Sequence, residues 1–259
     1  MRKRLLVLLL PLLSTPLQAH AASPPCGGSV IDSSLPQSER VEQLTREALA
    51  CVKAGKSVRA IAYLSEIIGF DPNRAQAYLN RGNTFARLGD FDAGLADYGR
   101  VIALEPNQFE GWYNRGSARV AVGQYDAAIA DLTEAIRLKP NVGYAYCSRG
   151  LSHLRKAERA KALADFEKGL SLWVDMPLCY YGRGEIRLAD GKHQDAIDDF
   201  SRGIKSKPTA ESLTQRAAAY ETIGEIQKAL KDYRSALSLQ PRLKTAEAGI
   251  ARLTRNSQN

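Results

Sequence analysis

The sequence has few of the residues that commonly carry out chemistry. Its 259 residues include three histidines and four cysteines, and it contains no His-x-x-x-His, no Cys-x-x-Cys and no glycine-rich phosphate loop. Metal and nucleotide sites are usually recognised by such ligands at close spacing. We therefore expect no metal, no cofactor and no enzymatic activity, and we interpret His153 and His193 as core residues.

Long hydrophobic runs are also missing. The run that opens the chain follows Arg2, Lys3 and Arg4, covers the nine residues Leu5–Leu13 and is interrupted by Pro11. A membrane-spanning helix needs about 20 apolar residues, so this run is too short to be one. Cations, a short apolar run and small residues at 19–21 are typical of a secretory signal peptide. We expect residues 1–21 to be removed and the mature chain to be periplasmic or secreted, without a membrane span.

The excess of basic over acidic residues is moderate. The chain has 36 Lys and Arg against 28 Asp and Glu, a formal net charge of +8, and part of that charge belongs to the signal peptide. We therefore expect no nucleic-acid partner. The sequence also has no Asn-x-Ser/Thr sequon, which favours a bacterial exported protein over a glycosylated one.

The chain is instead dominated by a repeat of 34 residues. Each block has a large residue at its fourth place, a small one at its eighth and twentieth, and a large one at its twenty-fourth, and most blocks close with proline. In the third block these are Trp112, Gly116, Ala128, Leu132 and Pro140. Each block holds two stretches of helical spacing around a turn, which predicts a helical hairpin. The blocks are 41–74, 75–108, 109–142, 143–176, 177–210 and 210–243.

This pattern resembles the tetratricopeptide repeat (TPR) family over about four-fifths of the chain. The resemblance implies an all-α fold, a right-handed α-α superhelix, or solenoid, of six hairpins over residues 41–243. We expect residues 244–259 to form a capping helix and tail. Residues 22–40, which are rich in Ser, Pro and Gly, are expected to be a flexible leader.

Helix starts and turns are marked by residues with suitable local chemistry. Good N-caps stand where the first helices of five blocks are expected to begin. They are Asn73, Asn107, Asn141, Asp175 and Thr209. Glycine occupies the turn inside the hairpins, except in the fourth block, where Ala157 takes its place.

An arginine recurs at the seventh place of five blocks and an aspartate at the twenty-third. Folding each hairpin about its turn brings these places together. The first block has Glu47 and Tyr63 instead, so both partners change together. We predict five structural ion pairs, with a row of anion-binding arginines as the alternative. The pairs are Arg81 and Asp97, Arg115 and Asp131, Arg149 and Asp165, Arg183 and Asp199, and Arg216 and Asp232.

All four cysteines lie beyond the predicted signal peptide, and an even number suits an oxidising compartment. Cys147 and Cys179 stand near the starts of the first helices of adjacent blocks, and Cys26 is close enough in sequence to tie the leader to Cys51. Two disulfides and free buried thiols remain open alternatives.

In the family that the sequence resembles, the first helix of each hairpin lines a concave groove that holds a polypeptide. The resemblance implies that the groove of this chain presents Gln76, Asn80, Asn83, Glu110, Tyr113, Asn114, Ser117, Tyr144 and Tyr181. Asparagine amides can both donate to and accept from a peptide backbone, and the alternative is that they bond only to local backbone groups. Some family members clamp a C-terminal carboxylate, but Leu79, Tyr144 and Ser148 replace the cations that such a clamp needs.

We therefore predict a non-enzymatic scaffold or adaptor whose partner is another protein or peptide. The alternative is a periplasmic factor that associates with the envelope by binding anionic polymer or lipid headgroups. It would use the basic convex face of the second helices and turns, which includes Lys168, Arg202, Lys205, Lys207 and Arg234.

Overall fold

The structure is a computed structural model that describes Cys26 and residues 31–256. It contains two compact units, one ending at Pro140 and one beginning at Asn141. These residues form thirteen α-helices and no β-strand. The predicted signal peptide lies outside the described residues, and so do residues 22–25 and 27–30 of the predicted leader.

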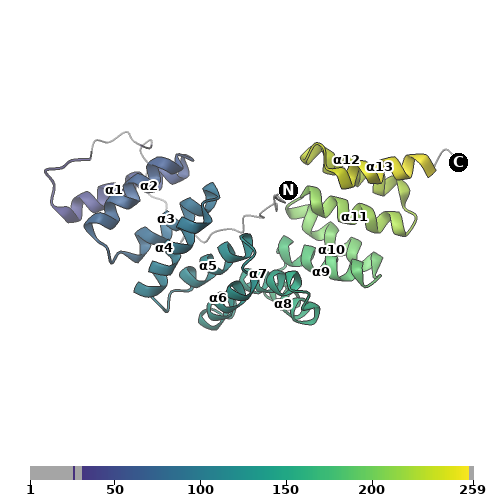
Figure 1. Cartoon of the computed structure of the whole chain (residues 1–259), viewed down its shortest axis with the longest axis horizontal. Helices are drawn as coiled ribbons and strands as arrows, with labels where there is room; N and C mark the ends of the chain where they lie inside the picture. The colour runs from purple at the N-terminus through teal and green to yellow at the C-terminus, as the bar shows by residue number, and fades with distance from the viewer. Residues whose placement is uncertain (1–25, 27–30, 257–259) are drawn as a thin grey trace. The chain divides into compact units, whose positions relative to one another are not determined.

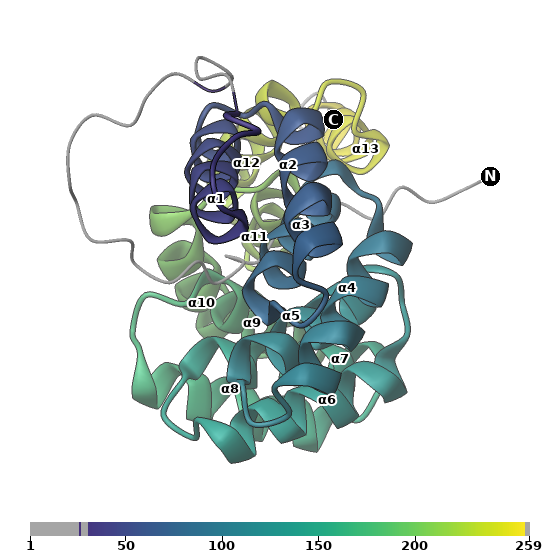
Figure 2. The ribbon, with the colours of Figure 1, turned by 90° about the vertical axis from the view of Figure 1, so that its left-hand side faces the viewer.

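The first unit contains three helical hairpins (Figure 1). Their helices are α1 (Gln37–Lys53), α2 (Ser57–Phe70), α3 (Ala75–Leu88), α4 (Phe91–Leu104), α5 (Phe109–Ala121) and α6 (Tyr125–Leu138). Within each hairpin the two helices pack on each other, and α2 and α4 also pack on the first helix of the next hairpin. Figure 2 shows α1 to α4 following one another in this order.

The second unit contains three more hairpins and one final helix. Its helices are α7 (Gly143–Arg155), α8 (Arg159–Leu172), α9 (Pro177–Ala189), α10 (His193–Ser206), α11 (Ala210–Thr222), α12 (Ile226–Leu239) and α13 (Lys244–Asn256). Helix α13 packs on α12, and its Leu253 joins the core around Tyr233. The predicted all-α array of six hairpins and a final helix is confirmed.

The small residue at the eighth place of each block lets the two helices of a hairpin approach closely. In α5, a Cβ atom added at Gly116 would lie 2.8 Å from Cγ of Leu132 on α6. In α7, one added at Gly150 would lie 2.8 Å from Cε1 of Phe166 on α8. Leu132 and Phe166 are fully buried, so each core is built from a large residue against a missing side chain.

The turn inside each hairpin requires the left-handed backbone region. Gly89 has φ +83°, and Ala157, which replaces the glycine in the fourth block, adopts φ +62°. The fold therefore imposes this turn on a residue with a Cβ atom, for which the conformation is unfavourable.

Four of the five predicted N-caps are wrong. The first helices begin one residue later than expected, after Arg74, Gln108, Val142 and Met176, and none of these makes a side-chain cap. At the end of the second block, Pro106 and Asn107 form a turn instead, closed by a hydrogen bond from Gln108 N to Glu105 O of 3.0 Å. Thr209 does cap its helix, because its side chain accepts from Ser212 N.

Candidate functional site

Five arginine–aspartate pairs join the two helices of five hairpins. In the second hairpin, Arg81 Nε donates to Asp97 Oδ2 at 2.9 Å and Arg81 Nη2 donates to Asp97 Oδ1 at 2.8 Å. The same two-point contact recurs in the pairs of Arg115 with Asp131, Arg149 with Asp165, Arg183 with Asp199, and Arg216 with Asp232. Hydrogen bonding to Asp97 raises the pKa of Arg81. Because each guanidinium uses two donors on a buried carboxylate, this geometry supports a structural role.

A second basic side chain reaches three of these aspartates, and sequence reasoning missed it. Arg119 Nη1 lies 2.7 Å from Asp131 Oδ2, and Arg187 Nη1 lies 2.8 Å from Asp199 Oδ2. In the fourth hairpin, His153 Nε2 lies 4.0 Å from Asp165 Oδ2. All three basic side chains stand at the eleventh place of their blocks. Recurrence at that place was the available signal.

His153 is buried, as predicted for a core residue, but its ring also contacts a carboxylate. Its Nδ1 lies 2.6 Å from Glu158 Oε2, and the ammonium groups of Lys156 and Lys161 lie 3.2 Å from the same carboxylate. These contacts, that with His153 first, lower the pKa of Glu158 to about 2. His193 is half-buried, and its Nδ1 has no hydrogen-bond partner within the described part of the chain.

The four cysteines form two disulfides in the structure, Cys26 with Cys51 and Cys147 with Cys179. The Cα atoms of Cys147 on α7 and Cys179 on α9 are 5.0 Å apart. Their sulfur atoms pack against Gly169 of α8, where an added Cβ atom would lie 2.7 Å from Cys179 Sγ. This disulfide thus joins the first helices of two neighbouring hairpins across the intervening helix.

The predicted groove residues of the first unit form a hydrogen-bonded polar cluster. Asn83 Oδ1 accepts from Tyr98 OH and from Asn114 Nδ2, each at 2.9 Å. Gln76 is exposed and donates to Asn80 Oδ1 at 3.0 Å. Asn80 and Asn83 are half-buried. This cluster therefore links α3 to α4 and α5 and reaches the surface along α3.

The structure corrects the prediction that all of these side chains are open to a ligand. Tyr113, Asn114 and Ser117 are buried, and Tyr113 stacks on Phe109 with ring centroids 5.6 Å apart. In the second unit, Tyr181 is buried and donates to the backbone carbonyl of Lys207. Packing against neighbouring helices, which a single repeat does not reveal, accounts for this burial.

The remaining two predicted contacts are partly exposed. Glu110 accepts a hydrogen bond from Lys139 Nζ at 2.9 Å, so its charge is already paired. Tyr144 is half-buried at the start of α7.

Several buried polar atoms of the first unit lack a hydrogen-bond partner in the described structure, including two that belong to predicted groove residues of α5. Asn114 Oδ1 and Ser117 Oγ have no hydrogen-bond partner within the described residues. In the second unit, the buried Ser148 Oγ donates to the carbonyl of Tyr144 at 2.9 Å. A buried polar group without a partner is destabilising, so Asn114 Oδ1 and Ser117 Oγ lower the stability of the first unit.

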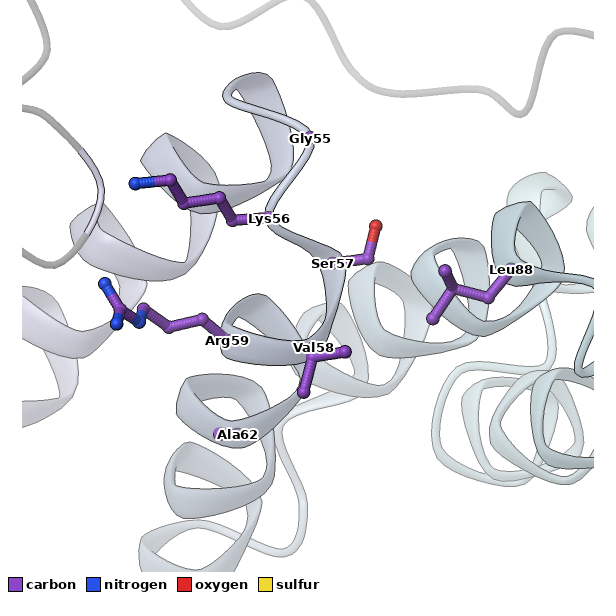
Figure 3. Close-up of a pocket in the computed structure, with 7 residues that line it drawn as sticks. All are labelled: Gly55, Lys56, Ser57, Val58, Arg59, Ala62 and Leu88. Atoms are coloured by element: carbon purple, nitrogen blue, oxygen red, sulfur yellow. The ribbon is translucent and has the colours of Figure 1, made fainter.

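An open pocket lies at the turn end of the first unit (Figure 3). It is lined by Gly55, Lys56, Ser57, Val58, Arg59, Ala62 and Leu88. Figure 3 shows Lys56 and Arg59 extending to one side and Leu88 lying on the other. Val58 and Leu88 are exposed, and sequence reasoning did not identify this surface.

Two searches of the described residues gave negative results. Neither Cys26 nor residues 31–256 contain a group of three or more His, Cys, Asp or Glu placed to hold a metal ion. In the same residues, each helix is too short or too polar to cross a membrane.

Comparison with solved structures relates the fold to known proteins. PilF of Pseudomonas aeruginosa is 18% identical with a TM-score of 0.72, and the match covers 83% of this chain and 99% of that one. The Cut9–Hcn1 hetero-tetramer of the APC/C is 16% identical with a TM-score of 0.72, and the match covers 86% of this chain and 47% of that one. This chain thus spans about half the length of that relative. YrrB, described as a TPR protein with an unusual peptide-binding site, is 20% identical with a TM-score of 0.51, over 71% of this chain and 96% of that one.

At these identities the likeness concerns the fold, and it establishes the superhelical repeat architecture that the sequence predicts. None of the curated proteins matches this chain. A tetratricopeptide repeat model matches residues 45–106 and 79–143, and a model described as the ETO1 C-terminal domain matches residues 113–253, more than half of the chain. The two family models together cover residues 45–253, and this protein belongs to the tetratricopeptide repeat family.

Proposed function

We propose that this protein is a non-enzymatic scaffold that holds an extended segment of another polypeptide along the first helices of its hairpins. Tetratricopeptide repeat proteins generally mediate protein–protein interaction, and this chain contains their repeat. The observation that carries the proposal is the row of accessible amide side chains along α3, where Gln76 is exposed and Asn80 and Asn83 are half-buried. Backbone N–H groups of a bound peptide are suitable donors.

The position of the cluster suits such a ligand. Gln76 is exposed and Asn80 and Asn83 are half-buried, so a peptide lying along α3 would meet amide groups at successive turns. No large charge dominates the cluster, since Glu110 is paired with Lys139. The proposed partner is therefore a segment of modest charge whose backbone is accessible.

Photo-crosslinking in living cells tests this proposal. A photoreactive amino acid at Gln76 should capture a discrete protein, whereas the same residue at Arg137 on α6, whose side chain is 62% exposed, should not. Equal capture from both positions, or capture only from 137, would contradict groove binding.

A pair of variants separates binding from stability. In protein that carries the photoreactive residue at position 76, Asn80→Ala removes the next accessible amide along α3. Because the bond from Gln76 to Asn80 is already absent there, this variant should weaken capture and leave the free energy of unfolding nearly unchanged. Ser148→Ala is the control, since that buried hydroxyl donates to the Tyr144 carbonyl. Capture that persists undiminished in Asn80→Ala would argue against the assigned amides.

We further propose that the mature protein is exported, in the periplasm or secreted. The composition of residues 1–21 and the two disulfides support this proposal. The test is N-terminal sequencing and non-reducing peptide mapping of protein isolated from its native cells. A start near Ala22 with both disulfides intact is expected, and an intact Met1 with free thiols would refute export.

A further inference from the structure

The connection between α8 and α9 exposes two adjacent apolar side chains. Trp173 is 59% exposed and Val174 is 78% exposed. The equivalent residues are Glu105 and Pro106 in the second block and Lys139 and Pro140 in the third. A large apolar side chain left in water forgoes the favourable free energy of burial, so the fold itself does not require tryptophan here.

The backbone on both sides of this connection is fixed. Trp173 N donates to the Gly169 carbonyl at 3.0 Å, which holds it to the end of α8. On the other side α9 begins at Pro177, and Cys179 is joined to Cys147 of α7. The two side chains thus lie on a short loop that is anchored at both ends, which lowers the entropic cost of binding.

Cations without carboxylate partners lie close to the loop. Tyr181 in the first turn of α9 donates to the Lys207 carbonyl, and the ring centroid of Tyr180 lies 5.9 Å from Arg202 Cζ. The end of α10, which carries Arg202 and Lys205, therefore lies beside the start of α9, together with Lys207 directly after it. Lys168 occupies the place on α8 that Arg202 occupies on α10. Among the described residues no carboxylate lies within ion-pair distance of Lys168, Lys205 or Lys207, which are all exposed.

The acidic groups of the region are fewer. Asp175 lies in the loop itself. The charge of Glu167 interacts with Arg183. The pKa of Arg183 is raised first by its hydrogen bond to Asp199 and further by the charge of Glu167. The balance around Trp173 and Val174 is therefore positive.

We propose that this surface, formed by Trp173, Val174, Lys168, Lys205 and Lys207, docks on an anionic lipid bilayer. Tryptophan is favoured at the boundary between headgroups and acyl chains, because its ring is apolar and its N–H is polar. Lysines next to an anionic bilayer each strengthen binding about fivefold. Neither signal alone gives stable attachment, and this loop combines the two.

A lipid surface explains these residues better than a protein partner does. Protein interfaces are centred on apolar clusters and are depleted of lysine at the core, and stable ones bury about 800 Å² on each partner. Here two apolar residues are surrounded by exposed lysines. The proposal is independent of peptide binding along α3, because it involves residues of the second unit alone.

The test uses the full-length protein and vesicles of defined composition. In a Trp112→Phe background, Trp173 is the single tryptophan of the chain and reports directly on the loop. With phosphatidylglycerol–phosphatidylethanolamine vesicles at low salt, the protein should sediment with the vesicles and its emission should shift to the blue. Phosphatidylcholine vesicles should produce neither effect.

Variants identify the surface. Changing both Lys205 and Lys207 to Gln should weaken binding about 25-fold, at about fivefold for each lysine, and the pair Trp173→Ser and Val174→Ser should abolish sedimentation. Two matched controls should change binding less than about twofold. One is Val58→Ser, since Val58 is also 78% exposed. The other is Lys53→Gln with Lys56→Gln, since both lysines are exposed. The proposal is overturned by any of three results: wild-type protein that stays in the supernatant, sedimentation without a change in Trp173 emission, or control variants that lose binding equally.

Discussion

Arg119 places Nη1 at 2.7 Å from Oδ2 of Asp131. The same carboxylate also binds Arg115 through two donors, so one buried aspartate holds two guanidinium groups across the third hairpin. In the second hairpin the residue at the equivalent place is Phe85, and Asp97 holds Arg81 alone. Two hairpins of one chain thus provide a direct comparison of single and double pairing.

Replacing Asp131 by Asn should therefore cost more than replacing Asp97 by Asn. Asp131→Asn leaves two partly buried cations without their counter-charge, and we expect a loss of about 3 kcal/mol in the free energy of unfolding, against about 2 kcal/mol for Asp97→Asn. Urea unfolding of the two variants measures the difference. Equal losses would show that Arg119 contributes nothing to the pairing.

Ala157→Gly should stabilise the protein. Ala157 has φ +62°, a conformation that costs a residue with a Cβ atom about 1 kcal/mol relative to glycine, so we expect the free energy of unfolding to rise by about that amount. Ala54→Gly is the control, since Ala54 ends α1 with φ −78° and glycine there only adds freedom to the unfolded chain. If both variants lose stability, the left-handed turn carries no strain.

The hairpins could be predicted because their packing recurs with the repeat. Gly116 and Leu132 contact each other inside one hairpin, so their spacing appears in every block. The burial of Asn114 could not be predicted in the same way, since its amide bonds to Asn83 of the preceding hairpin. Contacts between repeats depend on how neighbouring helices cross, and the sequence of one block does not contain that information.

The second basic side chains were missed for a different reason. Arg119, His153 and Arg187 share a place but not a side chain, and aromatic residues occupy that place in the second and sixth blocks. Only the three-dimensional contact with an aspartate makes them members of one set.

Glu158 should make the stability of the second unit depend on acid pH. His153, Lys161 and Lys156 lower the pKa of Glu158 from its ordinary value of 4.5 to about 2. Because the folded-state pKa is the lower one, the stabilisation is complete above about pH 4.5 and is lost as the pH falls toward 2. The free energy of unfolding should therefore fall less steeply with acid in Glu158→Gln than in the wild type. The control is Asp92→Asn, which removes a carboxylate without an ion pair in the described structure. If the free energy of unfolding of Glu158→Gln falls with acid as steeply as that of the wild type, Glu158 is not the group responsible.

Two helix glycines provide the last test, because they differ in what surrounds them. At Gly169 an added Cβ atom would lie 2.7 Å from Cys179 Sγ, 2.9 Å from Cys147 Sγ and 3.0 Å from the Gly143 carbonyl, whereas at Gly69 it would meet nothing within 4 Å. Gly169→Ala must therefore push apart the disulfide and α7, and we expect it to lower the free energy of unfolding by about 1 to 3 kcal/mol. Gly69→Ala should raise it by about 0.5 to 1 kcal/mol, since alanine favours the helix. Thermal unfolding under non-reducing conditions compares the two.

A second comparison shows whether the disulfide is what fills the space at Gly169. In a background that carries Cys147→Ala and Cys179→Ala, which lacks the disulfide, Gly169→Ala should lower the free energy of unfolding much less than it does in the wild type. An equal loss in both backgrounds would assign the close packing to the helix backbones instead.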